Sequence, residues 1–136
     1  MSDKKIFIDT NIIIYLVKDN TGKAELIASK IIEKADFYIS VQVLNEFCNI
    51  ALKKLDFTYS NILFIINKFT ENFVIMSIDV STIKLALQIK EKYSFSYYDS
   101  LIVASALENK CSILYTEDMH HNQVIENSLT IINPFL

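Results

Sequence analysis

Short apolar runs alternate along the chain with longer segments that carry one apolar face. The first run occupies residues 5–8 and ends at Asp9, and similar runs recur at intervals. Each run is continuous rather than alternating, which is typical of strands covered by helices on both faces of a sheet. The pattern predicts strands at residues 5–8, 37–39, 73–78, 112–115 and 129–132.

Between these runs, apolar residues recur every three or four positions, which is the period of an amphipathic helix. The segment at residues 23–35 shows this spacing clearly. In the segment at residues 41–54, the predicted core stripe is Val41, Leu44, Cys48, Ala51 and Leu55, joined by Phe47, and Glu46 lies away from its centre. Helices are predicted at residues 12–17, 23–35, 41–54, 60–70 and 80–93, and another begins near residue 97.

Strands that alternate with helices predict an open α/β fold with three layers. Its centre is a mostly parallel sheet of four or five strands, and helices cover both faces. At 136 residues, with one glycine and one proline, the chain is predicted to form a single domain over residues 1–136. Ligands of such sheets bind outside the carboxyl ends of the strands, so polar residues at those ends are the candidates for a functional site.

Composition excludes several classes of protein. The net charge of −3 is unusual for a protein that coats nucleic acid, although it is compatible with an enzyme whose metal ions meet the phosphate. Cys48 and Cys111 are isolated from each other and from any histidine pair, so buried thiols are expected rather than a zinc site or a disulfide. The apolar runs are too short for a membrane span and no signal sequence is evident, so a cytoplasmic location is expected.

Carboxylates stand where the predicted strands and helices meet. Asp9 directly follows the first strand, Asp99 lies in the first turn of an almost wholly apolar helix, and Glu117 and Asp118 follow the strand at residues 112–115. At close range, each pair of such acids repels by about 1 to 4 kcal/mol. A hard cation such as Mg²⁺ or Mn²⁺ relieves that repulsion with oxygen ligands, and it can activate a water for hydrolysis of a phosphodiester.

Four segments of the chain resemble the PIN-domain ribonucleases, and most closely the VapC-type toxins of bacterial toxin–antitoxin pairs. The matching segments are residues 7–12, 40–47, 98–106 and 114–119, and they occur in the order found in that family. The resemblance implies a PIN-like fold and a Mg²⁺- or Mn²⁺-dependent endoribonuclease that acts on RNA. It also implies a cognate antitoxin and a homodimer as partners.

The same resemblance implies which residues form the site. Asp9, Glu46, Asp99 and Asp118 are expected to hold the metal and to be catalytic, with Thr10 or Asn11 assisting. Glu46 taken alone reads as an ordinary surface glutamate, and only the resemblance raises it to a ligand. Glu117 has no firm counterpart in the family, so it is treated as an outer helper.

Other interpretations remain open from the sequence. A haloacid-dehalogenase-like phosphatase also has an aspartate after its first strand, but it needs a second aspartate two positions later, where this chain has Asn11. A non-catalytic, receiver-like binding module would not need Glu46 and Asp118 beside the other acids. His120 and His121 could assist the site or touch RNA, although loop histidines are more often surface groups. Tyr97 and Tyr98 could stack on bases, although packing is the commoner role.

Overall fold

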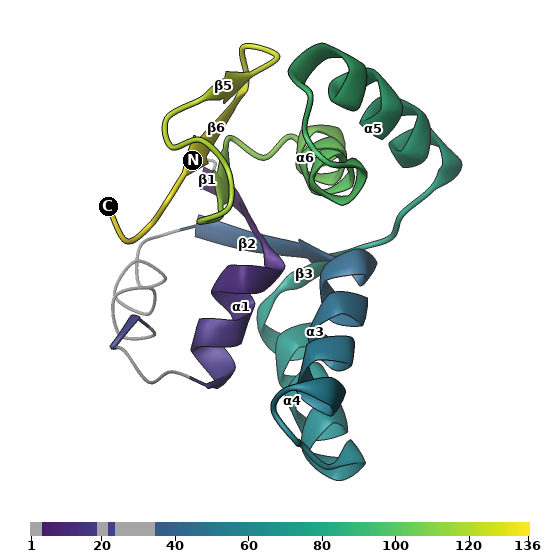
Figure 1. Ribbon diagram of the computed structural model, residues 1–136, viewed down its shortest axis with the longest axis vertical. Helices are drawn as coiled ribbons and strands as arrows, with labels where there is room; N and C mark the ends of the chain where they lie inside the picture. The colour runs from purple at the N-terminus through teal and green to yellow at the C-terminus, as the bar shows by residue number, and fades with distance from the viewer. Residues whose placement is uncertain (1–3, 19–21, 24–34) are drawn as a thin grey trace.

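A central sheet of six strands organises the part of the chain that the computed structural model describes, residues 4–18, 22–23 and 35–136 (Figure 1). The strands are β1 (Lys4–Ile8), β2 (Ala35–Ser40), β3 (Val74–Met76), β4 (Ile113–Tyr115), β5 (Val124–Ile125) and β6 (Leu129–Ile132). They lie in the order β3-β2-β1-β4-β6-β5, and every pairing is parallel except that of β5 with β6. The carboxyl ends of the five parallel strands therefore meet at one edge.

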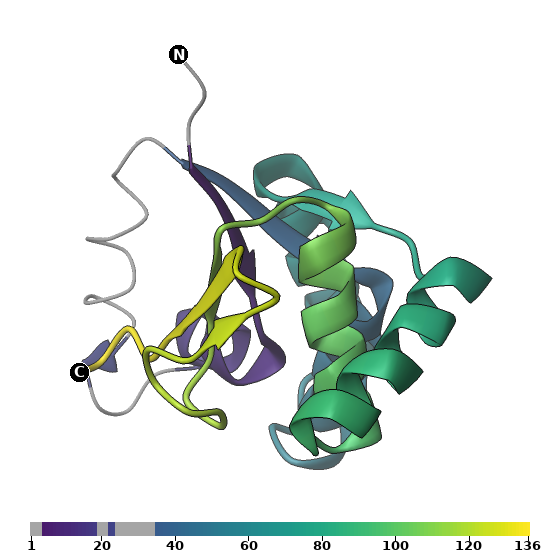
Figure 2. The ribbon, with the colours of Figure 1, turned by 90° about the horizontal axis from the view of Figure 1, so that it is seen from above.

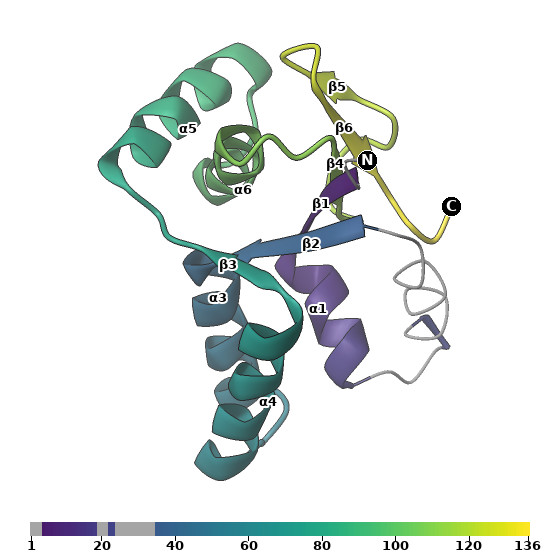
Figure 3. The ribbon, with the colours of Figure 1, turned by 180° about the vertical axis from the view of Figure 1, so that it is seen from behind.

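Helices cover both faces of this sheet. They are α1 (Thr10–Val17), α3 (Val41–Lys53), α4 (Tyr59–Asn72), α5 (Val80–Tyr93) and α6 (Tyr97–Glu108). Figures 1 and 3 place α1, α3 and α4 on one face and α5 with α6 on the other. Helix α6 lies against the sheet and α5 packs on its outer side (Figure 2). Among the described residues, no helix is both long and apolar enough to span a membrane.

Burial explains why the segment after residue 97 is so apolar. All residues from 100 to 106 of α6 are buried, because this helix is enclosed between the sheet and α5. On the central strand β1, Ile6, Phe7 and Ile8 are at most 1% exposed. Continuous apolar runs are what such doubly covered elements require.

The predicted α/β architecture is confirmed, with differences in detail. The additional strand β5 has only two residues and pairs antiparallel, so it has no apolar run by which to be recognised. The third strand is shorter than the predicted residues 73–78. Of the helix predicted at residues 23–35, residues 24–34 lie outside the described part of the chain, and Ala35 begins β2 instead.

The predicted core stripe of α3 was partly wrong. The buried residues are Gln42, Val43, Phe47 and Ala51, whereas Val41 is 40% exposed. The buried face of α3 is therefore rotated toward Gln42 and Val43 and away from Val41. Phe47, which lies on both the predicted and the observed face, packs edge-on against Phe69 of α4 with ring centroids 5.3 Å apart. This rotation brings Gln42 and Glu46 to the margin of the buried face, where they approach the carboxyl edge of the sheet.

Candidate active site

The carboxyl ends of β1 and β4 lie side by side at the middle of the sheet. From β1 the chain continues to β2 on one side, whereas β4 is followed by β6 on the other, so this is the point where the strand order reverses. Ligands of open α/β sheets bind at such switch points. The backbone N–H of Asp9 donates to the Tyr115 carbonyl at 3.0 Å, which joins the two strand ends.

Asp9 is the most deeply buried acid at this edge, with 5% of its surface exposed. Its Oδ1 accepts a hydrogen bond from the Thr10 backbone N–H at 2.7 Å, and its Oδ2 accepts one from the Thr116 hydroxyl at 2.9 Å. Burial raises the pKa of Asp9 to about 7. The two hydrogen bonds lower this pKa, whereas the charges of Asp99 and Glu46 raise it further. An acid held in this way is poised for a cationic partner.

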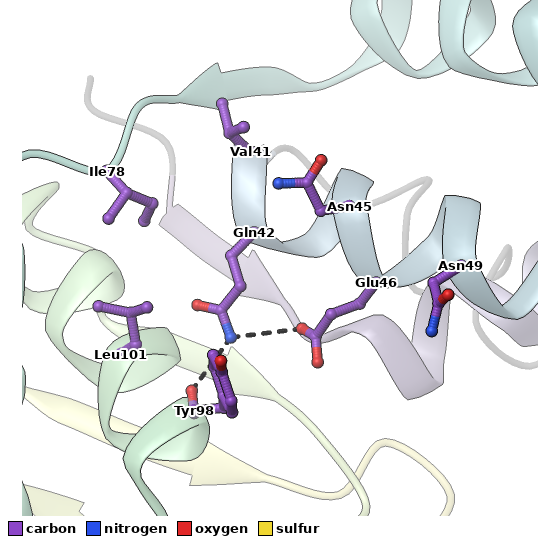
Figure 4. A pocket seen from close by; sticks show the side chains of 8 residues that line it. All are labelled: Val41, Gln42, Asn45, Glu46, Asn49, Ile78, Tyr98 and Leu101. Carbon is purple, nitrogen blue, oxygen red and sulfur yellow. Dashed lines mark hydrogen bonds between the residues drawn. The ribbon is translucent and has the colours of Figure 1, made fainter.

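Glu46 approaches from the second turn of α3. Its Oε1 accepts a hydrogen bond from the Thr10 hydroxyl at 3.0 Å. The same oxygen accepts one from the Gln42 amide at 3.3 Å (Figure 4). Burial raises the pKa of Glu46, the two hydrogen bonds lower it, and the charge of Asp99 raises it further. The same Gln42 amide nitrogen donates to the Tyr98 carbonyl at 3.2 Å, which ties α3 to the start of α6.

Asp99 and Asp118 complete the group of acids. Asp99 lies in the first turn of α6, where its backbone N–H donates to the Ser96 hydroxyl at 3.1 Å. Burial raises the pKa of Asp99, and the charge of Asp118 adds to that effect. Asp118 accepts a hydrogen bond from the Asn11 amide at 2.8 Å. We refer to Asp9, Glu46, Asp99 and Asp118 as the acidic site.

The acidic site has the character of an oxygen-ligand cation site. Within residues 4–18, 22–23 and 35–136, the ion pairs involve other acids, so none of these four carboxylates is paired with a lysine. Asn11 Oδ1 is buried beside them and has no hydrogen-bond partner in the described part of the chain. Among the described residues, no three His, Cys, Asp or Glu side chains are close enough together to coordinate one ion as they stand. Charge and donor chemistry nevertheless fit a hard divalent cation.

The remaining candidates point elsewhere. Glu117 accepts hydrogen bonds from the Tyr15 hydroxyl at 2.6 Å and from Lys23 Nζ at 3.2 Å, so its carboxylate faces α1 rather than the acidic site. His121 Nδ1 accepts the backbone N–H of Asn133 at 2.9 Å, and His120 is exposed. Among the described residues, none of these three side chains has a hydrogen bond to the acidic site.

Two residues that hold the acidic site in place were missed from the sequence. Thr116 is fully buried, donates to Asp9, and accepts hydrogen bonds from Asn11 at 3.2 Å and from the Asp118 backbone N–H at 3.2 Å. Gln42 positions Glu46 one helical turn away. Two signals in the sequence would have indicated them. Thr116 directly precedes an acidic pair at a strand end, and Gln42 lies four positions before Glu46 on the same helix.

Comparison with known proteins identifies the family. The PIN domain family matches residues 6–126, so this chain belongs to it, as the four resembling segments predicted. No curated protein sequence matches the chain significantly.

Solved structures share the fold at low sequence identity. A toxin–antitoxin complex from Klebsiella pneumoniae is 19% identical, with a TM-score of 0.71 over 95% of this chain and 97% of the other. VapBC2 from Rickettsia felis, bound to a promoter DNA fragment, is 15% identical, with a TM-score of 0.70 over 95% and 99%. Mycobacterium tuberculosis VapC20, described as a toxin that cleaves the sarcin–ricin loop, is 14% identical, with a TM-score of 0.67 over 83% and 89%.

Proposed function

We propose that this protein is a Mg²⁺- or Mn²⁺-dependent endoribonuclease and the toxin of a toxin–antitoxin pair. The observation that carries the proposal is the buried Asp9, whose pKa is raised to about 7, grouped with three further acids at the switch point of a PIN domain. The names of the similar structures support it, because they describe toxin–antitoxin complexes and an RNA-cleaving toxin. A phosphatase that needs an aspartate two positions after Asp9 is disfavoured, since Asn11 stands there and binds Asp118.

In this proposal Asp9, Glu46, Asp99 and Asp118 would hold the metal, and their neighbours orient them. A divalent cation, when bound, lowers the pKa of a water and offsets negative charge on a phosphate. Thr116 fixes the Asp9 carboxylate, and Thr10 with Gln42 fixes that of Glu46. Partners of this kind orient ligands and strengthen metal binding in known sites.

An RNA cleavage assay tests the proposal. The wild-type protein is expected to cleave RNA internally with Mg²⁺ or Mn²⁺ and to stop when EDTA is added. Asp9→Ala and Asp99→Ala are expected to lose this activity. Asp36→Ala, which removes an exposed acid from β2, is expected to retain it. Undiminished cleavage by both Asp9→Ala and Asp99→Ala would contradict the proposed ribonuclease function. If the wild type showed no metal-dependent cleavage, a non-catalytic binding module would be favoured instead.

We propose in addition that the protein forms a homodimer and binds an antitoxin. Two helices expose apolar residues: Val80, Ile83 and Leu87 on α5, and Tyr59, Leu63 and Phe64 on α4. Apolar groups gathered on a surface in this way commonly mark protein interfaces. A small DNA-binding protein encoded directly upstream would support the antitoxin.

For the dimer, light scattering of the purified chain is expected to report twice its mass of 15.7 kDa. Leu87→Glu or Leu63→Glu is expected to shift that mass to the monomer, because a charge buried in an apolar interface is costly. Comparison of the two variants shows which helix forms the contact. A monomeric wild type at micromolar concentration, or a dimer that survives both substitutions, would contradict this expectation.

A further inference from the structure

A groove between α3 and α6 adjoins the acidic site. It has a volume of about 490 Å³, within the range of clefts that bind small ligands. Its walls carry Asn45, Glu46 and Asn49 from α3 and Tyr98 from α6 (Figure 4). Because Glu46 belongs to both the groove and the acidic site, a molecule bound in the groove would lie next to the proposed metal position. We call this cleft the α3–α6 groove.

The chemistry of the lining indicates a neutral occupant with a large apolar surface and a few polar groups. Among the residues that the structure describes, Glu46 is the only charged one that lines the groove, so a phosphate there would meet a carboxylate and no lysine of the described chain. Ile78 and Leu101 supply apolar surface, whereas the side chains of Asn45 and Asn49 offer both hydrogen-bond donors and acceptors. Apolar faces and polar edges together are the properties of a nucleobase.

Gln42 provides an independent indication of a ligand, because it lines the groove and its side-chain oxygen lacks a hydrogen-bond donor among the described residues. Its residue is 8% exposed, and its amide nitrogen is satisfied by Glu46 and by the Tyr98 carbonyl. Its Oε1 is buried and has no hydrogen-bond partner among the described residues. Unsatisfied buried acceptors are costly, so an N–H donor that reached this atom from the groove would be favoured.

The two neighbouring tyrosines at the start of α6 have different roles in the structure. Tyr97 packs against the buried cluster of Ala86, Leu101 and Ala104. Tyr98 is 64% exposed and borders the groove. Exposed aromatic rings are the usual stacking surfaces for bases of single-stranded RNA.

We propose that the α3–α6 groove binds one unstacked base of a single-stranded RNA, next to the phosphodiester that is cleaved. The base stacks on Tyr98, and Asn45 and the Gln42 Oε1 contact its polar edge. The inference rests on the proposed ribonuclease function and adds the part of the site that selects where the RNA is cut. Tyr98 and Asn45 act on binding and specificity, not on the chemical step.

Substitution of Tyr98 tests the stacking. Binding of a fluorescently labelled RNA hexamer is measured with EDTA present, so that no cleavage occurs, and cleavage kinetics are measured separately with Mn²⁺. Tyr98→Ala is expected to weaken binding and to raise KM by about 5- to 150-fold with little change in kcat, because stacking is lost while the acidic site remains. Tyr98→Phe keeps an aromatic ring and is expected to behave as the wild type. Val124→Ala, which trims an apolar side chain that is 51% exposed on β5 and belongs to neither the acidic site nor the groove, serves as the control.

Substitution of Asn45 tests the reading of the base edge. Sequencing of the cleaved ends is expected to show one preferred base at a fixed position beside the cut, and Asn45→Leu, similar in size but without hydrogen bonds, is expected to lose that preference. Thermal melts verify that each variant is folded. If the wild type cleaves RNA but Tyr98→Ala matches it in affinity, KM and base preference, the groove inference fails while the proposed function stands. If the wild type cleaves no RNA, the proposed function itself fails.

A protein occupant would also be detected. If Tyr98→Ala leaves RNA binding unchanged but weakens binding of the protein encoded upstream, the groove is a protein-binding surface and the inference is overturned. Weaker RNA binding by Tyr98→Ala that Tyr98→Phe restores would support the base-binding groove.

Discussion

RNA cleavage by the Asp99→Asn variant is expected to be at least about 100-fold slower than by the wild type. Loss of residues that merely orient metal ligands costs about 10- to 100-fold in metal affinity or activity, so loss of a proposed ligand is expected to cost at least the upper end of that range. Asparagine preserves the size of the side chain. Asp36→Asn on β2 is the matched control, because that acid is exposed.

The same substitution is expected to stabilise the metal-free protein. Burial and the charge of Asp118 raise the pKa of Asp99, so the ionised form is disfavoured in the folded state. An aspartate at a helix N-terminus is favoured by about 0.3 to 1 kcal/mol, which opposes the effect, but the pKa is raised overall. Thermal melts in EDTA at pH 8 are therefore expected to show a higher Tm for Asp99→Asn. A lower Tm would contradict this expectation, because it would show that the ionised Asp99 carboxylate stabilises the folded state despite its burial and the charge of Asp118.

The metal-free protein is also expected to lose stability as the pH rises from about 4 to about 7. The pKa of Asp9 is 3.8 in an ordinary setting and about 7 in the folded chain, so between these values the folded state holds a proton that the unfolded state has released. Stability is then fully present below the lower pKa and is lost as the pH rises through the higher one. For Asp9 alone the loss amounts to roughly 4 kcal/mol.

Chemical denaturation in EDTA at several pH values measures this loss. Asp9→Asn keeps a side chain that accepts hydrogen bonds and has no charge to titrate, so its pH dependence is expected to be much flatter. Millimolar Mg²⁺ or Mn²⁺ is expected to cancel much of the wild-type loss near neutral pH, since a cation favours the ionised carboxylates. A wild type whose stability rises over this window, or whose slope matches that of Asp9→Asn, would contradict the burial of an ionisable Asp9.

Much of the fold follows from local pattern. Continuous apolar runs followed by capping residues predict the parallel strands and the helices after them, and α5 and β6 begin and end where their pattern does. Because the carboxyl ends of parallel strands share one edge, the position of Asp9 directly after β1 and that of Asp118 three residues after β4 predict that both lie at the same edge of the sheet. The PIN family follows from four short segments in order, each too weak alone.

The rest depends on contacts that local sequence does not contain. The face of α3 that is buried, which includes Gln42, is decided by the elements packed around the helix, and a helical period alone does not say which face is covered. Adjacent acids and adjacent tyrosines look alike in sequence, but Glu117 turns to Tyr15 while Asp118 meets Asn11 across 107 positions. Thr116 likewise contributes to the acidic site through a contact far apart in the sequence, because its hydroxyl donates to Asp9, 107 positions away. The sequence by itself determined the parallel strands, the helices between them and the edge of the sheet where the acids lie. The tertiary structure decided which side chains reach one another, because hydrogen bonding and burial depend on neighbours far apart in the chain.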